Sequence, residues 1–239
     1  MVVDTADAGR AGPRSGHRRR VWFLFVVAVV VGSVLVAPYL LLDVESSRLE
    51  VTSGLHYALL VTHIFTAMIA LVLGPLQFVP AIRVRRHWHR RIGRLYLFLG
   101  VVPSALAGIP VALLSGRLIT QIGLVIPSIG WLVTAWLAVR AIRRRDVEAH
   151  RSWMTRNYAL TFLAVTSRIL VPLLLLAQIP LAGATADSLA ASAPSLIPIG
   201  QVLGWVVNLV VAEIIIRRCR ARTPPLEGDD HYDHSGAGP

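Results

Sequence analysis

The sequence contains no lysine and a single cysteine, Cys219, and only 15% of its 239 residues are charged. One cysteine permits neither an intrachain disulfide nor a cysteine-based zinc site. The low charge, together with 55% hydrophobic residues and a mean hydropathy of +0.63, excludes an ordinary soluble enzyme. The composition is instead that of a membrane protein.

Six stretches of the chain are long and apolar enough to cross a bilayer, which takes roughly 20 helical residues because backbone polar groups must pair within the segment. The first four stretches contain no charged residue, and the last two contain Arg168 and Glu213. We therefore expect an all-α bundle of six transmembrane helices over residues 21–216. The expected spans are 21–42, 55–79, 95–114, 119–139, 158–181 and 194–216.

The 24 basic residues are all arginines, and they concentrate in alternate connections between the spans. Twenty-one of them lie before the first span, after the sixth, or in the connections that follow the second and fourth spans. The remaining connections hold only Arg48 and Arg117. Because basic loops resist translocation, this asymmetry predicts that both termini are cytoplasmic and that the protein lies in a plasma membrane, which we expect to be bacterial.

Both ends of the chain are polar and poor in the apolar residues that would offset the entropy of ordering. Residues 1–20 and 217–239 are therefore expected to be largely disordered cytoplasmic tails. The arginine clusters are expected to contact anionic phospholipid head groups rather than nucleic acid, because no nucleic-acid-binding module accompanies them.

Small residues on the last span allow close helix approach. Gly200 and Gly204 lie four residues apart and form a small-xxx-small face. This face serves either packing within the bundle or a homo-oligomer contact.

The two arginine-rich connections end alike. The first reads HWHRRIGRLY over residues 87–96, and the second reads HRSWMTRNY over residues 150–158. Each places a His-Arg pair before a helix, then an arginine, and a tyrosine two residues later. A weak internal duplication is one interpretation of this repeat.

With these loops, the sequence resembles the bacterial membrane proteins grouped as domain of unknown function 2306. The resemblance covers about residues 55–172 and implies a multi-pass helical bundle, with no established reaction attached. It rests on His63, the GPLQF run at 74–78, His89-Arg90, Gly93-Arg94, Tyr96, His150-Arg151, Trp153-Met154, Arg156 and Arg168.

Four polar residues fall near the predicted bilayer midplane. With a helical rise of 1.5 Å per residue, His63 lies about 12 Å and Arg168 about 15 Å inside their spans, and Ser104 and Asn208 lie at comparable depth. An arginine at that depth costs at least ~2.5 kcal/mol, so it is expected to face the bundle interior. Glu213 lies nearer the cytoplasmic end, where Arg217 or the loop arginines are its expected partners.

Two interpretations of the midplane residues remain open. In the first, His63, Arg168, Ser104 and Asn208 form a pocket that binds a small anionic or quinone-like ligand, with His63 as polar contact or proton carrier. In the second, helix carbonyls and water satisfy the arginine. The first is our leading functional hypothesis, that of a redox-associated or small-ligand membrane protein.

A haem b between two helices is the alternative cofactor hypothesis. It needs two imidazoles from different helices, with cations near the propionates. His89 and His150 precede the third and fifth spans, and Arg90 and Arg94 stand close to His89 in the sequence. The same histidines could instead be interfacial residues that bind lipid phosphate. No histidine box or metal site is expected, and a transporter or a structural protein without catalysis remain further alternatives.

Overall fold

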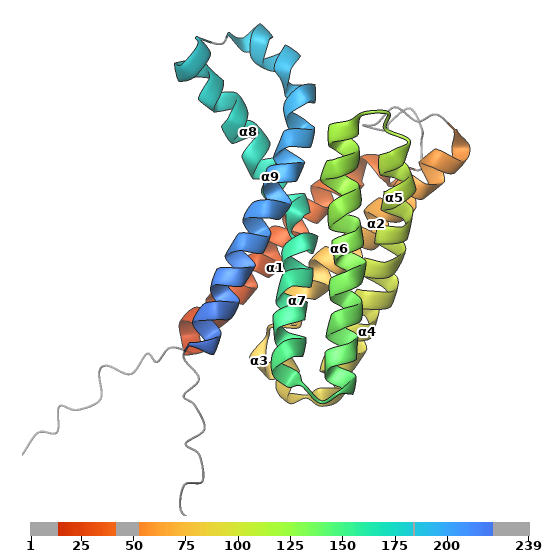
Figure 1. Cartoon of the computed structure of the whole chain (residues 1–239), viewed down its shortest axis with the longest axis vertical. Helices are drawn as coiled ribbons and strands as arrows, with labels where there is room; N and C mark the ends of the chain where they lie inside the picture. Colours follow the sequence, from red (N-terminus) through yellow and green to blue (C-terminus); the bar gives the residue numbers. More distant parts are fainter. Residues whose placement is uncertain (1–13, 42–52, 184, 222–239) are drawn as a thin grey trace, which may run out of the picture.

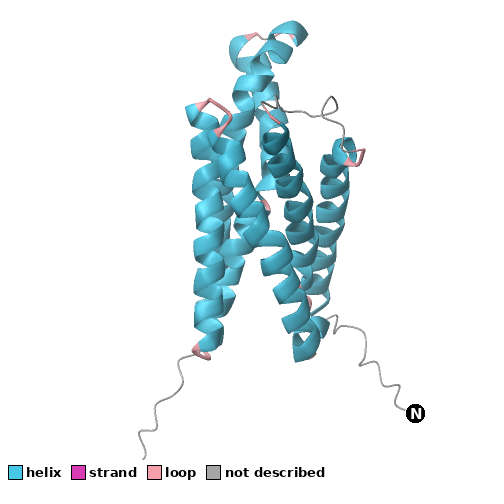
Figure 2. Ribbon diagram, turned by 90° about the vertical axis from the view of Figure 1, so that its right-hand side faces the viewer, coloured by secondary structure: helices cyan, strands magenta, loops and turns pink. Residues whose placement is uncertain are grey.

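The structure is a computed structural model that describes residues 14–41, 53–183 and 185–221. Every regular element within these ranges is a helix, as Figure 2 shows. Six helices are long and apolar enough to cross a membrane, so the prediction of an all-α, six-span protein is confirmed. They cover Arg19–Tyr39, Gly54–Leu76, Arg86–Leu113, Leu118–Arg143, Leu163–Leu181 and Ala186–Arg220.

Short helices and interruptions subdivide these spans. The elements in chain order are α1 (Arg14–Val36), η1 (Ala37–Tyr39), α2 (Gly54–Leu76), α3 (Pro80–Val84), α4 (Arg86–Leu95), η2 (Tyr96–Val101), α5 (Val102–Leu113), α6 (Leu118–Arg143), α7 (Val147–Thr161), α8 (Leu163–Ala182) and α9 (Ala186–Arg220).

Side-chain caps define where three of these helices begin. The Ser53 hydroxyl accepts a hydrogen bond from the His56 amide at 3.2 Å, and the Asp146 carboxylate accepts one from the Ala149 amide at 2.9 Å. Thr185 caps α9 in a reciprocal capping box with its third residue. Each cap satisfies a backbone N–H that the first helical turn leaves without a partner.

The third span is a continuous helix that starts at Arg86, before the predicted membrane segment, and widens in its middle. The π-helical turn η2 precedes Pro103. Because proline lacks an N–H and its ring crowds the carbonyl four residues earlier, the preceding turn opens to the wider spacing. Here the backbone at Gly100 approaches α2 so closely that a Cβ would lie 2.9 Å from that of Ala70.

The fifth predicted span, 158–181, is not one helix in the structure. The chain breaks at Phe162, between α7 and α8, whereas Pro172 and Pro180 lie inside α8. Threonine hydroxyls bond back to helix carbonyls on both sides of the break, Thr161 to Asn157 at 3.1 Å and Thr166 to Phe162 at 3.3 Å. Such back-bonding bends helices, so the break follows the threonines and not the prolines.

Consecutive helices pack side by side in the order α1, α2, α5, α6 and α7, and α9 lies along both α6 and α7. Figure 1 shows the hairpin of α8 and α9 leaning away from α5 and α6 at one end of the molecule. The largest core cluster joins α2, η2, α5, α6 and α7 around Tyr96, Trp131 and Tyr158. Many large apolar side chains remain exposed on the outer helix faces, as lipid contact requires.

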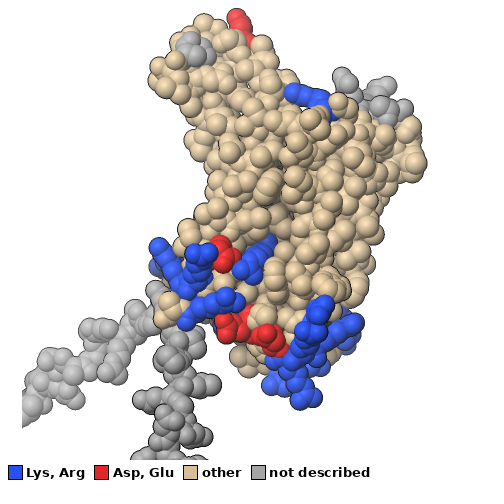
Figure 3. Space-filling model, viewed as in Figure 1, with Lys and Arg blue, Asp and Glu red and all other residues tan. Residues whose placement is uncertain are grey.

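The described arginines gather mainly at one end of the bundle. The start of α1, the end of α9 and the connections around α3 and after α6 share that end (Figure 1), and Figure 3 shows the basic side chains concentrated there. Residues 14–20 and 217–220 are helical, so α1 and α9 extend beyond the expected spans into both predicted tails. The remainder of both predicted tails lies outside the described residues, apart from Ala221.

The small-residue face of α9 packs against α8. A Cβ on Gly200 would collide with Val171, and one on Gly204 would lie 2.8 Å from Leu163 Cδ1. Both glycines are buried. Of the two roles that the sequence left open for this face, the structure shows packing within the bundle, against α8.

Candidate functional site

His63 and Ser104 join α2 to α5 through reciprocal hydrogen bonds. His63 Nδ1 lies 2.8 Å from the Ser104 carbonyl oxygen and 3.1 Å from its hydroxyl, and that hydroxyl donates to the His63 carbonyl at 3.0 Å. A carbonyl can only accept, so Nδ1 carries the hydrogen. In the neutral imidazole, Nε2 is therefore the acceptor nitrogen.

A glycine makes this approach of the two helices feasible. A Cβ on Gly108, one turn beyond Ser104 on α5, would lie 2.6 Å from His63 Nδ1. The imidazole thus occupies the space that any other residue at this position would fill.

Arg168 lies on α8 with its side chain exposed rather than enclosed, which differs from the expectation for a midplane arginine. Its guanidinium donates to the Ala164 carbonyl and the Ser167 hydroxyl, both at 3.2 Å. Its charge also acts on His63. Arg168 and His63 therefore lie within electrostatic reach of each other, although they stand on different helices.

Asn208 is engaged elsewhere. Its carbonyl accepts from the Thr166 hydroxyl at 2.8 Å, and its amide donates to the Ala159 carbonyl at 3.0 Å. These bonds tie α9 to α7 and α8 across the break. Three of the four predicted midplane residues therefore belong to two separate hydrogen-bonded groups. His63 bonds with Ser104, and Asn208 bonds with Thr166.

A second polar group lies at the arginine-rich end of the bundle, where the two histidines of the loop repeat approach each other. His89 on α4 lies within electrostatic reach of His150 on α7 and of Arg83 on α3. His150 Nδ1 donates to the Ala138 carbonyl at 2.9 Å, because a carbonyl only accepts. Its Nε2 is left with the lone pair that a metal ligand requires.

Two buried polar atoms near His89 have no hydrogen-bond partner among the described residues. They are His89 Nδ1 and the side-chain amide nitrogen of Gln77. The side-chain amide oxygen of Gln77, Oε1, lies 3.3 Å from the position that a Cβ on Gly93 would occupy. Since Gly93 and His89 are one turn apart on α4, Gln77 lies on the same face of α4 as His89. Buried polar groups without partners are rare, so these two nitrogens are available to bind a ligand.

The cations nearest the paired histidines differ in part from those expected. Partial burial and the charge of Arg151 lower the pKa of the Arg83 guanidinium. These two like charges therefore lie close together at this site. Arg90 and Arg94 are exposed and share one face of α4. This face points about 100–140° around the helix axis from His89, because each residue turns the helix by about 100°.

A fully buried hydrogen-bond network lies between these two groups, and sequence reasoning missed it. The Tyr96 hydroxyl donates to Asn157 Oδ1 at 2.6 Å and lies 2.8 Å from the Thr161 hydroxyl. The Trp131 indole donates to Thr161 at 3.0 Å, and the Asn157 amide donates to the Thr134 hydroxyl at 2.9 Å. The only sequence signal was the tyrosine of the loop repeat, which the structure places in the core.

Ion pairs connect α7 to α9 at the arginine-rich end. Arg156 contacts Glu213 at 2.7 Å, and Arg217 contacts the same carboxylate at 3.5 Å, which confirms the expected partners of Glu213. Arg220 pairs with Glu148 at 2.9 Å. In the described part of the chain, no three His, Cys, Asp or Glu residues are grouped as a metal site.

The helices, their apolar outer faces and the arginine distribution define a multi-pass α-helical membrane protein. A family model described as "Predicted membrane protein (DUF2306)" matches residues 60–216, more than half of the chain. The chain belongs to this family, which confirms the resemblance seen in the loops and extends it through the sixth span. No curated protein and no solved structure matches the chain.

Proposed function

We propose that this chain is a redox-associated membrane protein that holds a b-type haem between His89 and His150. The carrying observation is that two histidines from different helices lie within electrostatic reach, with His150 oriented by the Ala138 carbonyl so that Nε2 is free. A carbonyl that fixes the other ring nitrogen is the usual support of a ligating histidine.

The surrounding residues fit a haem. The propionates need cations, which Arg83 and Arg151 supply near His89. Gln77 adds a buried amide donor without a partner. A bound haem would supply one-electron transfer, while the chain itself orients the imidazoles, neutralises the propionates and excludes water.

Absorption spectroscopy of detergent-purified protein from haem-replete cells tests this proposal. We expect a Soret band that sharpens on reduction and is lost in both His89→Ala and His150→Ala. The matched control is His87→Ala, which removes an exposed histidine of the same loop and should leave the band unchanged. A colourless wild-type protein, or equal loss of the band in all three variants, would overturn the proposal.

The midplane supports a second candidate, a small polar or quinone-like ligand between His63 and Arg168. Two observations favour it. The bonds to Ser104 use Nδ1 of His63, so Nε2 can accept a hydrogen bond from a ligand. The exposed Arg168 is close enough for its charge to act on His63. Binding of a short-chain quinone to the purified protein tests it. His63→Ala and Arg168→Gln should each weaken binding, and Arg117→Gln, an exposed arginine at the opposite end of the bundle from the basic cluster, should not. Binding that both site variants leave intact would eliminate this candidate.

The orientation of the bundle is part of the same proposal. We infer that the arginine-rich end faces the cytoplasm of a bacterial cell, so that the haem site lies at the inner face of the plasma membrane. The support is the arginine asymmetry of the sequence, because cationic loops are retained on that side.

A further inference from the structure

The outward face of α6 carries a continuous exposed apolar stripe. Its members recur every three or four residues, which is the spacing of one helix face. From the start of α6, at the end of the bundle opposite the arginine cluster, toward the basic end they are Ile119, Ile122, Ile126, Ile129, Val133 and Trp136, each more than 40% exposed. In a membrane such a stripe lies against acyl chains.

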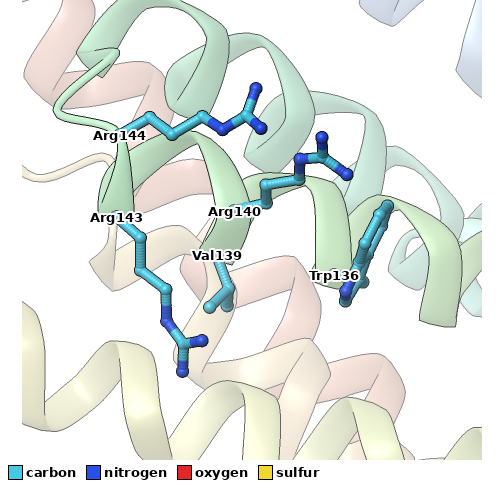
Figure 4. Close-up of a pocket in the computed structure, with 5 residues that line it drawn as sticks. All are labelled: Trp136, Val139, Arg140, Arg143 and Arg144. Atoms are coloured by element: carbon cyan, nitrogen blue, oxygen red, sulfur yellow. The ribbon is translucent and has the colours of Figure 1, made fainter.

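The stripe ends in a cationic hollow. The hollow is lined by Trp136, Val139, Arg140 and Arg143 from the last turns of α6 and by Arg144, which follows the helix. Figure 4 shows Arg140 extending toward Trp136, with Arg144 running alongside. The Arg140 guanidinium carbon lies 5.2 Å from the Trp136 ring centroid, which is a cation–π distance.

These arginines take no part in the ion pairs found among the described residues. Glu213 is engaged by Arg156 and Arg217, and Glu148 is engaged by Arg220. The cationic charge of the hollow is therefore left for a partner outside the described chain.

We propose that this face of α6 is a binding site for an anionic phospholipid. Its phosphate lies on Arg140 and Arg144, its glycerol region lies beside Trp136, and one acyl chain follows the isoleucine stripe. Guanidinium groups bind phosphate oxygens by charge-assisted hydrogen bonds, and tryptophan favours the depth of the head-group boundary. A lipid, rather than free phosphate, is indicated because the cations and the apolar stripe form one continuous surface. The inference is independent of the proposed haem.

Native mass spectrometry of the delipidated full chain in detergent tests this site. Phosphatidylglycerol should bind more tightly than phosphatidylcholine, and Arg140→Gln with Arg144→Gln should weaken its binding by about fivefold per arginine. Arg85→Gln with Arg86→Gln makes the same charge change on another exposed part of the basic end and should leave the affinity unchanged.

Two further experiments distinguish a lipid from free phosphate and test whether the lipid binds beside Trp136. Inorganic phosphate at millimolar concentration should not displace the lipid, and phosphatidylglycerol brominated on its acyl chain should quench less fluorescence in Trp136→Phe than in the wild type. Equal affinity for the two lipids, displacement by phosphate, equal losses in both double variants, or quenching that does not depend on Trp136 would each overturn the proposal.

Discussion

At the residue scale, the positions of two imidazoles depend on small neighbours and on single carbonyls. Nδ1 of His63 donates a hydrogen bond to the Ser104 carbonyl, and Nδ1 of His150 donates one to the Ala138 carbonyl. In each neutral ring Nε2 is therefore the acceptor nitrogen. The contact of His63 with Ser104 is possible because Gly108 has no side chain. Helix packing thus gives each of these two imidazoles a defined tautomer, which the sequence alone does not reveal.

Replacing Gly108 by Ala should destabilise the protein although it removes a helix-weakening glycine. The new Cβ would lie 2.6 Å from His63 Nδ1. Overpacking costs about 1–3 kcal/mol, which outweighs a helix-propensity gain of at most about 1 kcal/mol. The midpoint of thermal unfolding in detergent should therefore fall. Gly130→Ala is the control, since only the mobile end of Leu160 approaches its Cβ, at 3.3 Å. An unchanged midpoint for Gly108→Ala would contradict the tight contact.

The buried network predicts a cost for losing one hydroxyl. Tyr96→Phe should leave Asn157 and Thr161 each short of a partner inside the core. The expected loss is about 1 kcal/mol, because side-chain hydrogen bonds in membrane proteins average about 0.6 and reach about 1.7 kcal/mol. Thr155→Ala removes only an exposed intrahelical bond and is the matched control. Equal stability of the two variants, measured by unfolding in mixed micelles, would argue that the network carries no net stability.

At the scale of the elements, α7 is the helix that links the rest. It packs against both α6 and α9, and its Asn157, Thr161 and His150 side chains all form hydrogen bonds with α6. Its end at Phe162 lets α8 leave the bundle at another angle (Figure 1). Two ion pairs also join α7 to α9, one at Glu148 near the start of α7 and one at Arg156 in its second half.

These two ion pairs should contribute unequally. The Arg156 and Glu213 side chains are 22% and 37% exposed, whereas Arg220 and Glu148 are 55% and 71% exposed. Exposed ion pairs contribute little because water screens them, and the less exposed pair, in which two Arg156 N–H groups donate to one Glu213 oxygen, should contribute more. A double-mutant cycle on Arg156→Gln and Glu213→Gln should therefore show a coupling energy larger than the cycle on Arg220→Gln and Glu148→Gln. A larger coupling for the outer pair would contradict this assignment.

At the scale of the whole molecule, the charge pattern predicts how the chain crosses the membrane. The arginines gather at one end of the bundle (Figure 3), and the single cysteine, Cys219, is exposed at that end. A membrane-impermeant maleimide should label Cys219 in inside-out vesicles and not in intact cells. Asp187→Cys in a Cys219→Ser background should show the reverse, because Asp187 lies at the start of α9. The opposite labelling pattern would invert the topology and place the histidine pair outside the cell.

The number of spans and their apolar character could be predicted because hydropathy and arginine placement are local properties of the sequence. His89 and His150 were found from the repeated loop motif. Gln77 could not be assigned to their site, because its position depends on how α2 meets Gly93 on α4. The break at Phe162 was also missed, since the threonines that accompany it look ordinary in an apolar run. The small-residue face of α9 was ambiguous because its pattern does not specify which helix covers it.

Electron paramagnetic resonance of the oxidised protein tests the central claim, that His89 and His150 ligate one iron, most directly. The account predicts the low-spin ferric signal of a haem with two imidazole ligands in the wild type and in His87→Ala. In His89→Ala and His150→Ala it predicts conversion to a high-spin signal or loss of the haem. A wild type without a haem signal, or a low-spin signal that survives both substitutions, would contradict it.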